Sequence, residues 1–485
     1  MENLRGKTLA GLFWSLSERV GIQVIQFIPT IVLARLLAPE QFGLIGMLSL
    51  FIAVASVFLD SGFGVALIQK KDATHIDECS IFYFNIFIGG ISVLVLFYAA
   101  PLIANFFQQP ILTGLTRWLS LDILINSFSL IQTTLLTRKL DFKTQLKANL
   151  FATLASGLIG VAAAYLGWGV WSLVIQAIAN TLLRTVTLWL ICDWRPALIF
   201  SMDSLKGLFG FGSRMLMSSL VGTFFDNLYQ AFIGKVFSAA SLGYYTRAAS
   251  MRSIVVDTTS NTLGRVLYPA LASIQDDLAR LKRAYRKSMM LATFIHFPLM
   301  VGLIVVAQPL VYLLFSEKWA SSVVFFQLMC AAGLLYPLHL INLNILKVKG
   351  RSDLFFKLEI IKRILVIVGI FITYRWGISA MLIGQIVISI IAYFLNSFYS
   401  ERLIAYPVKA QVLDVLPSLL VSCLMGGGML WIGSAIKPAT NFVLLITQAG
   451  VGAIIYLLVN LVSRAEPLLE IIALTKRLPI FIARS

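Results

Sequence analysis

Fourteen long apolar stretches occupy most of this 485-residue chain, and they constrain its fold more than any other feature. Each is close to the roughly 20 residues that an α-helix needs to cross a bilayer. Hydrophobic residues make up 59% of the chain and charged residues only 13%, whereas a soluble protein has about 45–50% and about 25%. Too few polar side chains remain to cover a soluble fold. The sequence therefore predicts an all-α integral membrane protein.

The predicted spans alternate with short loops, and their number relates the two ends of the chain. Because the number is even, both termini lie on the same side of the membrane. Several spans contain charged residues within an otherwise apolar sequence. The fourteen predicted spans are residues 12–34, 41–69, 79–99, 112–136, 146–166, 170–191, 207–234, 241–270, 288–314, 320–346, 358–374, 377–399, 412–432 and 440–462.

Lysine and arginine are unevenly distributed between the two sets of loops. The termini and the even-numbered loops hold 25 of them, counting Lys147 at the first turn of the fifth span, whereas the odd-numbered loops hold five. Cytoplasmic loops of membrane proteins carry such an excess, so both termini are predicted to be cytoplasmic. The formal net charge of +17 then reflects topology. A nucleic-acid-binding protein would instead gather its positive charge on one soluble face, so no nucleic-acid partner is expected.

The sequence offers little chemistry for an enzyme. Its four cysteines and three histidines are scattered, so neither a disulfide framework nor a metal site is predicted. It has no phosphate-binding glycine loop of the G-x-x-x-x-G-K-[ST] type, and no cofactor is expected. An integral-membrane enzyme that modifies glycans is the remote alternative. Only His339 lies deep enough in a span to suggest one, and a lone histidine there is expected to be a packed polar residue.

The chain contains an internal repeat of about 200 residues. Gly43 and Gly64 are separated by the same distance along the chain as Gly243 and Gly264. Spans 1–6 and 7–12 are therefore predicted to be parallel repeats, an arrangement typical of secondary transporters with a substrate path between two halves. The predicted parts are an N-terminal lobe (1–203), a C-terminal lobe (204–405), spans 13–14 (406–462) and an amphipathic cytoplasmic tail (463–485).

Nine charged residues lie in spans 1, 2, 7 and 8, the two leading spans of each repeat. A charge inside the hydrocarbon costs about 2.5–3.5 kcal/mol, so it is expected to face a wet cavity or a partner of opposite charge. Arginine suits phosphate because its guanidinium can form two parallel hydrogen bonds. Five arginines are therefore predicted to line a central cavity and bind an anionic substrate: Arg19, Arg214, Arg247, Arg252 and Arg265.

Four acidic residues share these spans, namely Glu18, Asp60, Asp226 and Asp257. Each either neutralises a cavity arginine or binds a proton or cation that drives transport. Glu18 and Asp60 lie at the depth of cavity arginines, so they are expected to pair with them. Asp226 has no arginine close to it on its own helix, so it is the predicted coupling residue.

Five stretches of sequence carry a resemblance through their order and spacing. They are Val32-Leu-Ala-Arg-Leu-Leu-Ala-Pro-Glu-Gln-Phe-Gly-Leu, Leu67-Ile-Gln-Lys-Lys-Asp, Arg138-Lys-Leu-Asp-Phe-Lys, Arg265-Val-Leu-Tyr-Pro-Ala-Leu-Ala-Ser-Ile-Gln-Asp-Asp and Phe315-Ser-Glu-Lys-Trp. With them, the chain resembles the bacterial polysaccharide exporters of the multidrug/oligosaccharidyl-lipid/polysaccharide superfamily. The similarity is to the branch that contains colanic-acid and teichuronic-acid exporters.

This resemblance implies two six-helix lobes plus two extra helices, arranged in a V around a cavity lined by spans 1, 2, 7 and 8. It implies a flippase that moves undecaprenyl-diphosphate-linked oligosaccharide across the bacterial inner membrane by alternating access. The product would serve exopolysaccharide, capsule or O-antigen synthesis. The implied partners are this substrate, membrane lipids and a polysaccharide polymerase complex, and the chain is expected to be a monomer.

Two alternatives belong to the same superfamily. A multidrug antiporter would usually have twelve spans and an acidic cleft, because most of its drugs are cationic. A lipid II flippase also has fourteen spans and a basic cleft, but the local motifs favour the exporter branch.

Overall fold

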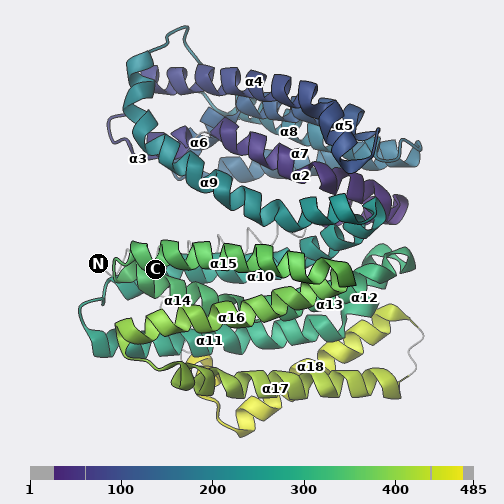
Figure 1. Ribbon diagram of the computed structural model, residues 1–485, viewed down its shortest axis with the longest axis vertical. Helices are drawn as coiled ribbons and strands as arrows, with labels where there is room; N and C mark the ends of the chain where they lie inside the picture. The colour runs from purple at the N-terminus through teal and green to yellow at the C-terminus, as the bar shows by residue number, and fades with distance from the viewer. Residues whose placement is uncertain (1–26, 61, 437–439, 473–485) are drawn as a thin grey trace. The chain divides into compact units, whose positions relative to one another are not determined.

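The computed structural model describes residues 27–60, 62–436 and 440–472, and for residues 257–266 it describes the helix without the side chains. Every regular element within these ranges is helical (Figure 1). The described residues form two compact units, one that ends at Thr246 and one that begins at Arg247. The prediction of an all-α protein is confirmed.

The first unit begins with a helix at Phe27–Leu36. Its last long helix, α9, packs on α2, α3 and α4. α10 begins in this unit and continues into the second. The elements are α2 (Pro39–Asp60), α3 (Phe63–Gln69), α4 (His75–Phe107), α5 (Leu112–Ser127), α6 (Leu130–Arg138), α7 (Phe142–Tyr165), α8 (Trp171–Ile191), α9 (Met202–Val236) and α10 (Ala239–Ala272).

The second unit is built around α11, which packs on α13, α14 and α17. Two short 3-10 helices, η1 (Glu317–Trp319) and η2 (Tyr374–Trp376), connect longer elements. The α-helices are α11 (Leu278–Val305), α12 (Ala307–Phe315), α13 (Ala320–Gly333), α14 (Tyr336–Val348), α15 (Ser352–Thr373), α16 (Ile378–Ile404), α17 (Val408–Ala435) and α18 (Asn441–Val462). The unit boundary at 246 differs from the lobe boundary at 203, which remains a prediction of the sequence repeat.

Ten helices within the described residues are long and apolar enough to cross a membrane, and the bent pair α5 and α6 makes an eleventh. The other predicted spans are the first, which lies partly outside the described residues, and the two that contain α10 and α15. Both helices carry several charged residues, which lower their hydropathy. The chain is thus a multi-pass membrane protein, and the number fourteen stays a prediction.

Four predicted spans are broken helices instead of continuous ones. α2 ends at Asp60 and α3 follows from Phe63, α11 gives way to α12 at Val306, and α13 is separated from α14 at 334–335. Between α5 and α6 the axis bends by 42°. The broken spans that contain α5 and α13 are the fourth of each predicted repeat. Hydropathy does not detect such breaks, because the sequence on both sides of each break is still predominantly apolar.

Loops that the charge pattern assigns to one side of the membrane contact each other within each unit. Arg138 donates to the carbonyl oxygen of Lys71 at 2.9 Å, and Lys349 donates to that of Gln275 at 2.6 Å. At the opposite ends of their helices, Lys235 donates to the carbonyl oxygen of Phe106. The alternation of spans is therefore consistent with the helix packing, whereas the side on which the termini lie stays a prediction.

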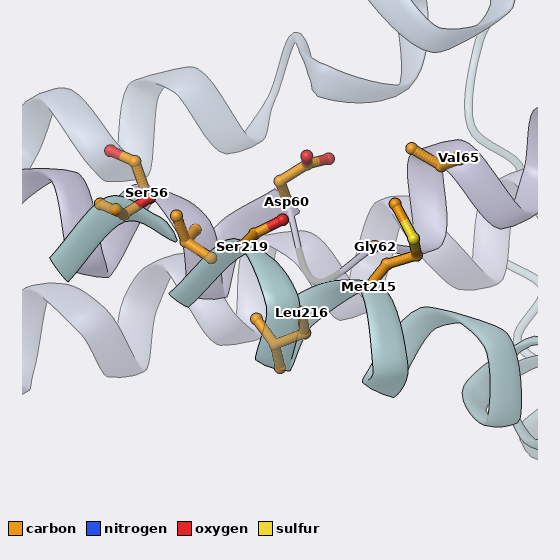
Figure 2. Close-up of a pocket in the computed structure, with 9 residues that line it drawn as sticks. Ser56, Asp60, Gly62, Val65, Met215, Leu216 and Ser219 are labelled. Atoms are coloured by element: carbon orange, nitrogen blue, oxygen red, sulfur yellow. The ribbon is translucent and has the colours of Figure 1, made fainter. Parts of the chain in front are cut away.

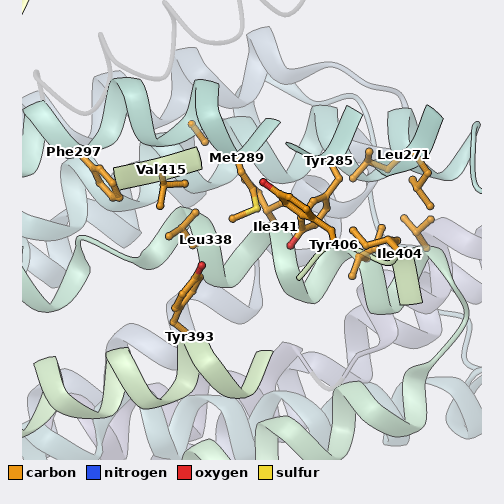
Figure 3. Packing of buried hydrophobic residues seen from close by; sticks show 14 residues of the cluster. Leu271, Tyr285, Met289, Phe297, Leu338, Ile341, Tyr393, Ile404, Tyr406 and Val415 are labelled. Carbon is orange, nitrogen blue, oxygen red and sulfur yellow. The ribbon is translucent and has the colours of Figure 1, made fainter. Parts of the chain in front are cut away.

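The core of the second unit joins helices that are far apart in the sequence (Figure 3). Leu271 on α10, Tyr285 on α11, Leu338 on α14, Tyr393 on α16 and Val415 on α17 are all buried in one cluster. Lipid tails are as apolar as these side chains, so close packing and polar contacts must hold the helices together. The Tyr285 hydroxyl provides one such contact, since it donates to Asn342 Oδ1 at 2.6 Å.

The described part of the C-terminal tail packs on protein. Residues 466–472 are helical, and Leu468 is buried in a cluster with Phe294 of α11 and Tyr456 of α18. Glu466 lies 3.5 Å from Arg286, and Glu470 contacts Lys287. These ion pairs fix the start of the tail to α11. The rest of the predicted amphipathic tail lies outside the described residues.

Candidate functional site

The break between α2 and α3 lies beside a pocket of about 320 Å³, which apolar side chains also line. We call it the polar pocket because it holds a carboxylate and three hydroxyl groups. Gly62 has a φ of +69°, and an added Cβ would overlap the carbonyl oxygen of Gly212 on α9. Glycine is required here both for the left-handed backbone and for the close approach of the two helices. Interrupted spans of this type form binding sites in secondary transporters.

Polar side chains from α2 and α9 line this pocket (Figure 2). α2 contributes the carboxylate of Asp60 and the hydroxyl of Ser56, and α9 contributes the hydroxyls of Ser219 and Thr223. Asp60 makes no ion pair with any residue that the structure describes. One carboxylate with three hydroxyls suits sugar hydroxyl groups or a cation, and it would repel a phosphate.

The opposite face of α2 borders an apolar groove of about 870 Å³ that also involves α4 and α9. Phe51, Val54 and Phe58 line the groove from α2, whereas Ser56 and Asp60 line the polar pocket. With 3.6 residues per turn, these two sets lie on opposite sides of the helix. α2 therefore separates an apolar surface from a polar one.

Arg214 lies on α9 immediately before Met215, which lines the polar pocket. Its side chain is exposed, and its Nε donates to the carbonyl oxygen of Gly210 at 2.8 Å. Three of the predicted cavity arginines have described side chains, and among these three Arg214 is the one that lies in the first unit. It does not line the pocket, and its predicted role in binding an anionic substrate stays a prediction.

Arg247 is buried against aromatic rings, with 5% of its surface exposed. Its guanidinium carbon lies 5.3 Å from the ring centre of Phe315 and 5.4 Å from that of Trp319. Both aromatic side chains are fully buried, and the positive φ of Ser316 between them allows the tight turn. The Phe315-Ser-Glu-Lys-Trp stretch thus packs around Arg247. A role of Arg247 in substrate binding stays a prediction.

Arg252 points toward α13 of its own unit. Its Cδ lies 3.9 Å from the position of a Cβ built on Gly333. Its positive charge also interacts electrostatically with the thiol of Cys330. Among the described residues, its Nε has no hydrogen-bond partner. Arg252 is therefore packed against α13, and its predicted role in substrate binding stays a prediction.

Four of the predicted site residues fall where no side chain is described. Glu18 and Arg19 precede residue 27, and Asp257 and Arg265 lie in the part of α10 without described side chains. Asp226 is exposed on α9 and interacts with another residue. The absence of a nearby arginine on its own helix is therefore no argument for a coupling role. The roles predicted for these residues stay predictions.

The first unit also contains a partly buried charged pair between α5 and α8. Asp122 on α5 faces Thr181 and Arg184 on α8, and Arg184 donates to Asn126 Oδ1 at 2.8 Å. The guanidinium carbon of Arg117, on the same helix as Asp122, lies 4.4 Å from the ring centre of Phe97. α8 therefore supplies the charged partner of Asp122.

Two of the sequence stretches shape one end of the first unit. Arg138 donates to the carbonyl oxygens of Lys70 and Lys71, and Lys70 forms an ion pair with Asp77 at 2.7 Å. Asp141 begins α7 by accepting from the hydroxyl of Thr144 at 2.7 Å and from its backbone N–H at 3.1 Å. These hydrogen bonds lower the pKa of the Asp141 carboxyl. This cluster is therefore structural.

Comparison with solved structures defines the class. The fold matches that of a structure described as the lipid II flippase MurJ in an inward closed conformation, with a TM-score of 0.74 and 14% identity over 92% of this chain and 98% of that one. An inward-facing multidrug resistance MATE family transporter of the MOP superfamily matches with a TM-score of 0.61 and 14% identity over 80% of this chain and 98% of that one. The chain has a membrane transporter fold.

The sequence comparisons then give the family. Residues 32–324, more than half of the chain, match the sequence model of the protein family described as polysaccharide biosynthesis protein. The chain therefore belongs to that family. It is 28% identical to the lipopolysaccharide biosynthesis protein WzxC of Escherichia coli (strain K12), over 87% of this chain and 88% of that protein. It is 25% identical to the teichuronic acid biosynthesis protein TuaB of Bacillus subtilis (strain 168), over 88% of this chain and 89% of that protein. The resemblance inferred from the sequence is confirmed.

Proposed function

We propose that this protein is a flippase that moves undecaprenyl-diphosphate-linked oligosaccharide across the bacterial inner membrane for polysaccharide synthesis. The observation that carries the proposal is the two-sided character of α2. Its polar face, with Asp60 and Ser56, suits sugar hydroxyls, and its apolar face, with Phe51 and Phe58, borders a groove suited to a hydrocarbon chain. A lipid-linked sugar has both parts. The family and the relatives WzxC and TuaB support the same substrate class.

The substrate explains why such a site is needed. A diphosphate and a glycan cannot cross hydrocarbon unaided, whereas the polyprenyl chain can remain in lipid. Transport then needs polar contacts for the head and an apolar surface for the tail, and it needs no bond to be made or broken. The arginines predicted to bind the diphosphate are Arg19, Arg214, Arg247, Arg252 and Arg265, and the acids predicted to couple transport to an ion are Glu18, Asp60, Asp226 and Asp257.

Loss of polymer in living cells tests this function. In a strain that lacks the gene, the wild-type chain is expected to restore polymer, whereas Arg214→Ala and Arg252→Ala restore less than about a tenth of it, since each removes a charged hydrogen-bond donor worth roughly 1.5–3 kcal/mol. Arg→Lys variants are expected to fall between, because lysine cannot form two parallel bonds. Polymer and protein levels would be measured together.

Arg280→Ala is the matched control, because Arg280 is exposed at the start of α11. It is expected to restore polymer fully. If cells without the gene make normal polymer and accumulate no lipid-linked oligosaccharide, the proposed function is wrong. If both arginine variants match the wild type, the assignment of these arginines fails while the function stands.

The orientation of the chain has its own test. We expect a single cysteine at Arg283, in a cysteine-free background, to react with an impermeant thiol reagent only after the cells are permeabilised. A single cysteine at Lys437 is expected to react in intact cells. The reason is the excess of lysine and arginine in the set of loops that includes Arg283. The reverse pattern would place both termini outside.

A further inference from the structure

A histidine in the second unit has a hydrogen-bond partner on each ring nitrogen. His339 lies on α14, one turn after the break that separates this helix from α13. Its Nε2 is 3.1 Å from the hydroxyl of Ser389, and its Nδ1 is 3.2 Å from the amide nitrogen of Asn396. Both partners lie on α16, seven residues apart and hence on one face of the helix. The break and this face fix the position of the ring.

The partners determine the protonation state of the ring. The amide nitrogen of Asn396 can only donate, so Nδ1 accepts, and the proton of a neutral ring lies on Nε2 and is donated to Ser389. Asn396 is fully buried, and its amide oxygen has no hydrogen-bond partner among the described residues. A half-turn of the amide would bring this oxygen to Nδ1, where it could accept from a protonated ring. The site can therefore satisfy the ring both with and without the second proton.

The surrounding titratable groups connect this ring to the neighbouring helices. α14 packs on α11, α15 and α16. α11 contributes Tyr285 and His296, whose Nε2 is 3.1 Å from the carbonyl oxygen of Gly333, and α16 contributes Tyr393. α15 contributes Lys362, whose charge acts on His339, and Glu359, which contacts Lys362. A second positive charge at His339 would thus act directly on the Glu359–Lys362 ion pair.

We propose that His339 binds the proton that couples transport to a pH gradient, with Asn396 as the amide that changes orientation when the proton binds. The inference rests on the proposed flippase function and adds a coupling site on α14. Histidine is the side chain that most readily gains and loses a proton in proteins, and ionisable groups inside membrane spans mark proton pathways. Protonation would repel Lys362 and attract Glu359, and this change would alter the packing of α15 on α14.

The test uses the full-length protein in proteoliposomes. The probe is the polyprenyl-diphosphate oligosaccharide extracted from cells that lack the gene, and the quantity measured is the ratio of flipping rates with and without an imposed gradient of one pH unit. We expect a ratio of about 10 for the wild type, since one unit supplies a tenfold difference in proton activity. His339→Gln is expected to reduce it to about 1. His296→Gln, a buried histidine on α11 bonded to a backbone carbonyl, is the matched control and is expected to keep the wild-type ratio.

A second variant separates proton binding from packing. Asn396→Asp places a carboxylate against Nδ1, which favours the protonated ring. It is expected to move the pH at half-maximal flipping upward by about one unit, whereas a purely structural role of His339 predicts no such movement.

The possible failures are distinguishable. If the wild type does not flip the probe under either condition, the proposed function fails. If the wild type flips it with no response to the gradient, or if His339→Gln keeps the wild-type ratio, the coupling site is overturned and the function stands. Loss of the response in Asp226→Asn alone would also overturn it, in favour of the carboxylate on α9.

Discussion

We expect the Gly43→Ala protein to lose about 3 kcal/mol of stability, because overpacking against backbone atoms that cannot move is costly. A Cβ on Gly43 would overlap the carbonyl oxygen of Ala239, and a Cβ on Gly243 would overlap that of Pro39. The first turns of α2 and α10 therefore cross with their backbones in contact, and the two glycines approach each other reciprocally. Backbone carbonyls in helices cannot shift as a flexible side chain can. Small residues allow such crossings within membranes.

The measurement is the thermal midpoint of the purified protein in detergent, together with the yield of monodisperse protein. Gly243→Ala is expected to behave like Gly43→Ala, because the contact is reciprocal. Gly90→Ala is the control, since a Cβ there would meet no atom within 4 Å and alanine favours a helix by about 1 kcal/mol. A Gly43→Ala protein as stable as the Gly90→Ala protein would show that the two helices do not cross so closely.

The second large effect is expected at Arg247. Its guanidinium occupies the space beside two fully buried rings, so Arg247→Ala leaves a cavity and removes two cation–π contacts. We expect a loss of about 3 kcal/mol. Arg247→Lys should recover only part of it, because an ammonium group does not stack as a planar guanidinium does. Thermal midpoints of the two variants check this.

Arg402 offers a control of the same type at an exposed position. Its guanidinium carbon lies 4.3 Å from the ring centre of Phe398, but the side chain is exposed, so Arg402→Ala is expected to cost less than about 1 kcal/mol. A double-mutant cycle of Arg247→Ala with Trp319→Leu should give a coupling energy of about 1 kcal/mol or more. Normal stability combined with lost export in Arg247→Ala would instead assign Arg247 to the substrate.

Gly43 and Gly243 show which structural features could be predicted from the sequence and which could not. Their equal spacing from Gly64 and Gly264 indicated a repeat, and the structure shows that the two glycines meet. The pattern could not predict this meeting, because periodicity identifies equivalent positions without saying which of them touch. Similarly, the sequence placed Asp60 in span 2, and the structure shows that it lines a pocket between α2 and α9 at a break in the helix.

The sequence by itself determined the class of protein, the positions of the apolar spans and their alternation. The reason is that each helix that crosses the hydrocarbon core needs its own run of apolar residues, and such a run is visible in the sequence. It also indicated the family, through short stretches in a fixed order. The tertiary structure decided where spans break, that Arg247 packs between Phe315 and Trp319, and that Asn396 faces His339. These features depend on partners 50 or more residues away along the chain, and the partner of a polar group inside a membrane is set by helix packing, which no local pattern records.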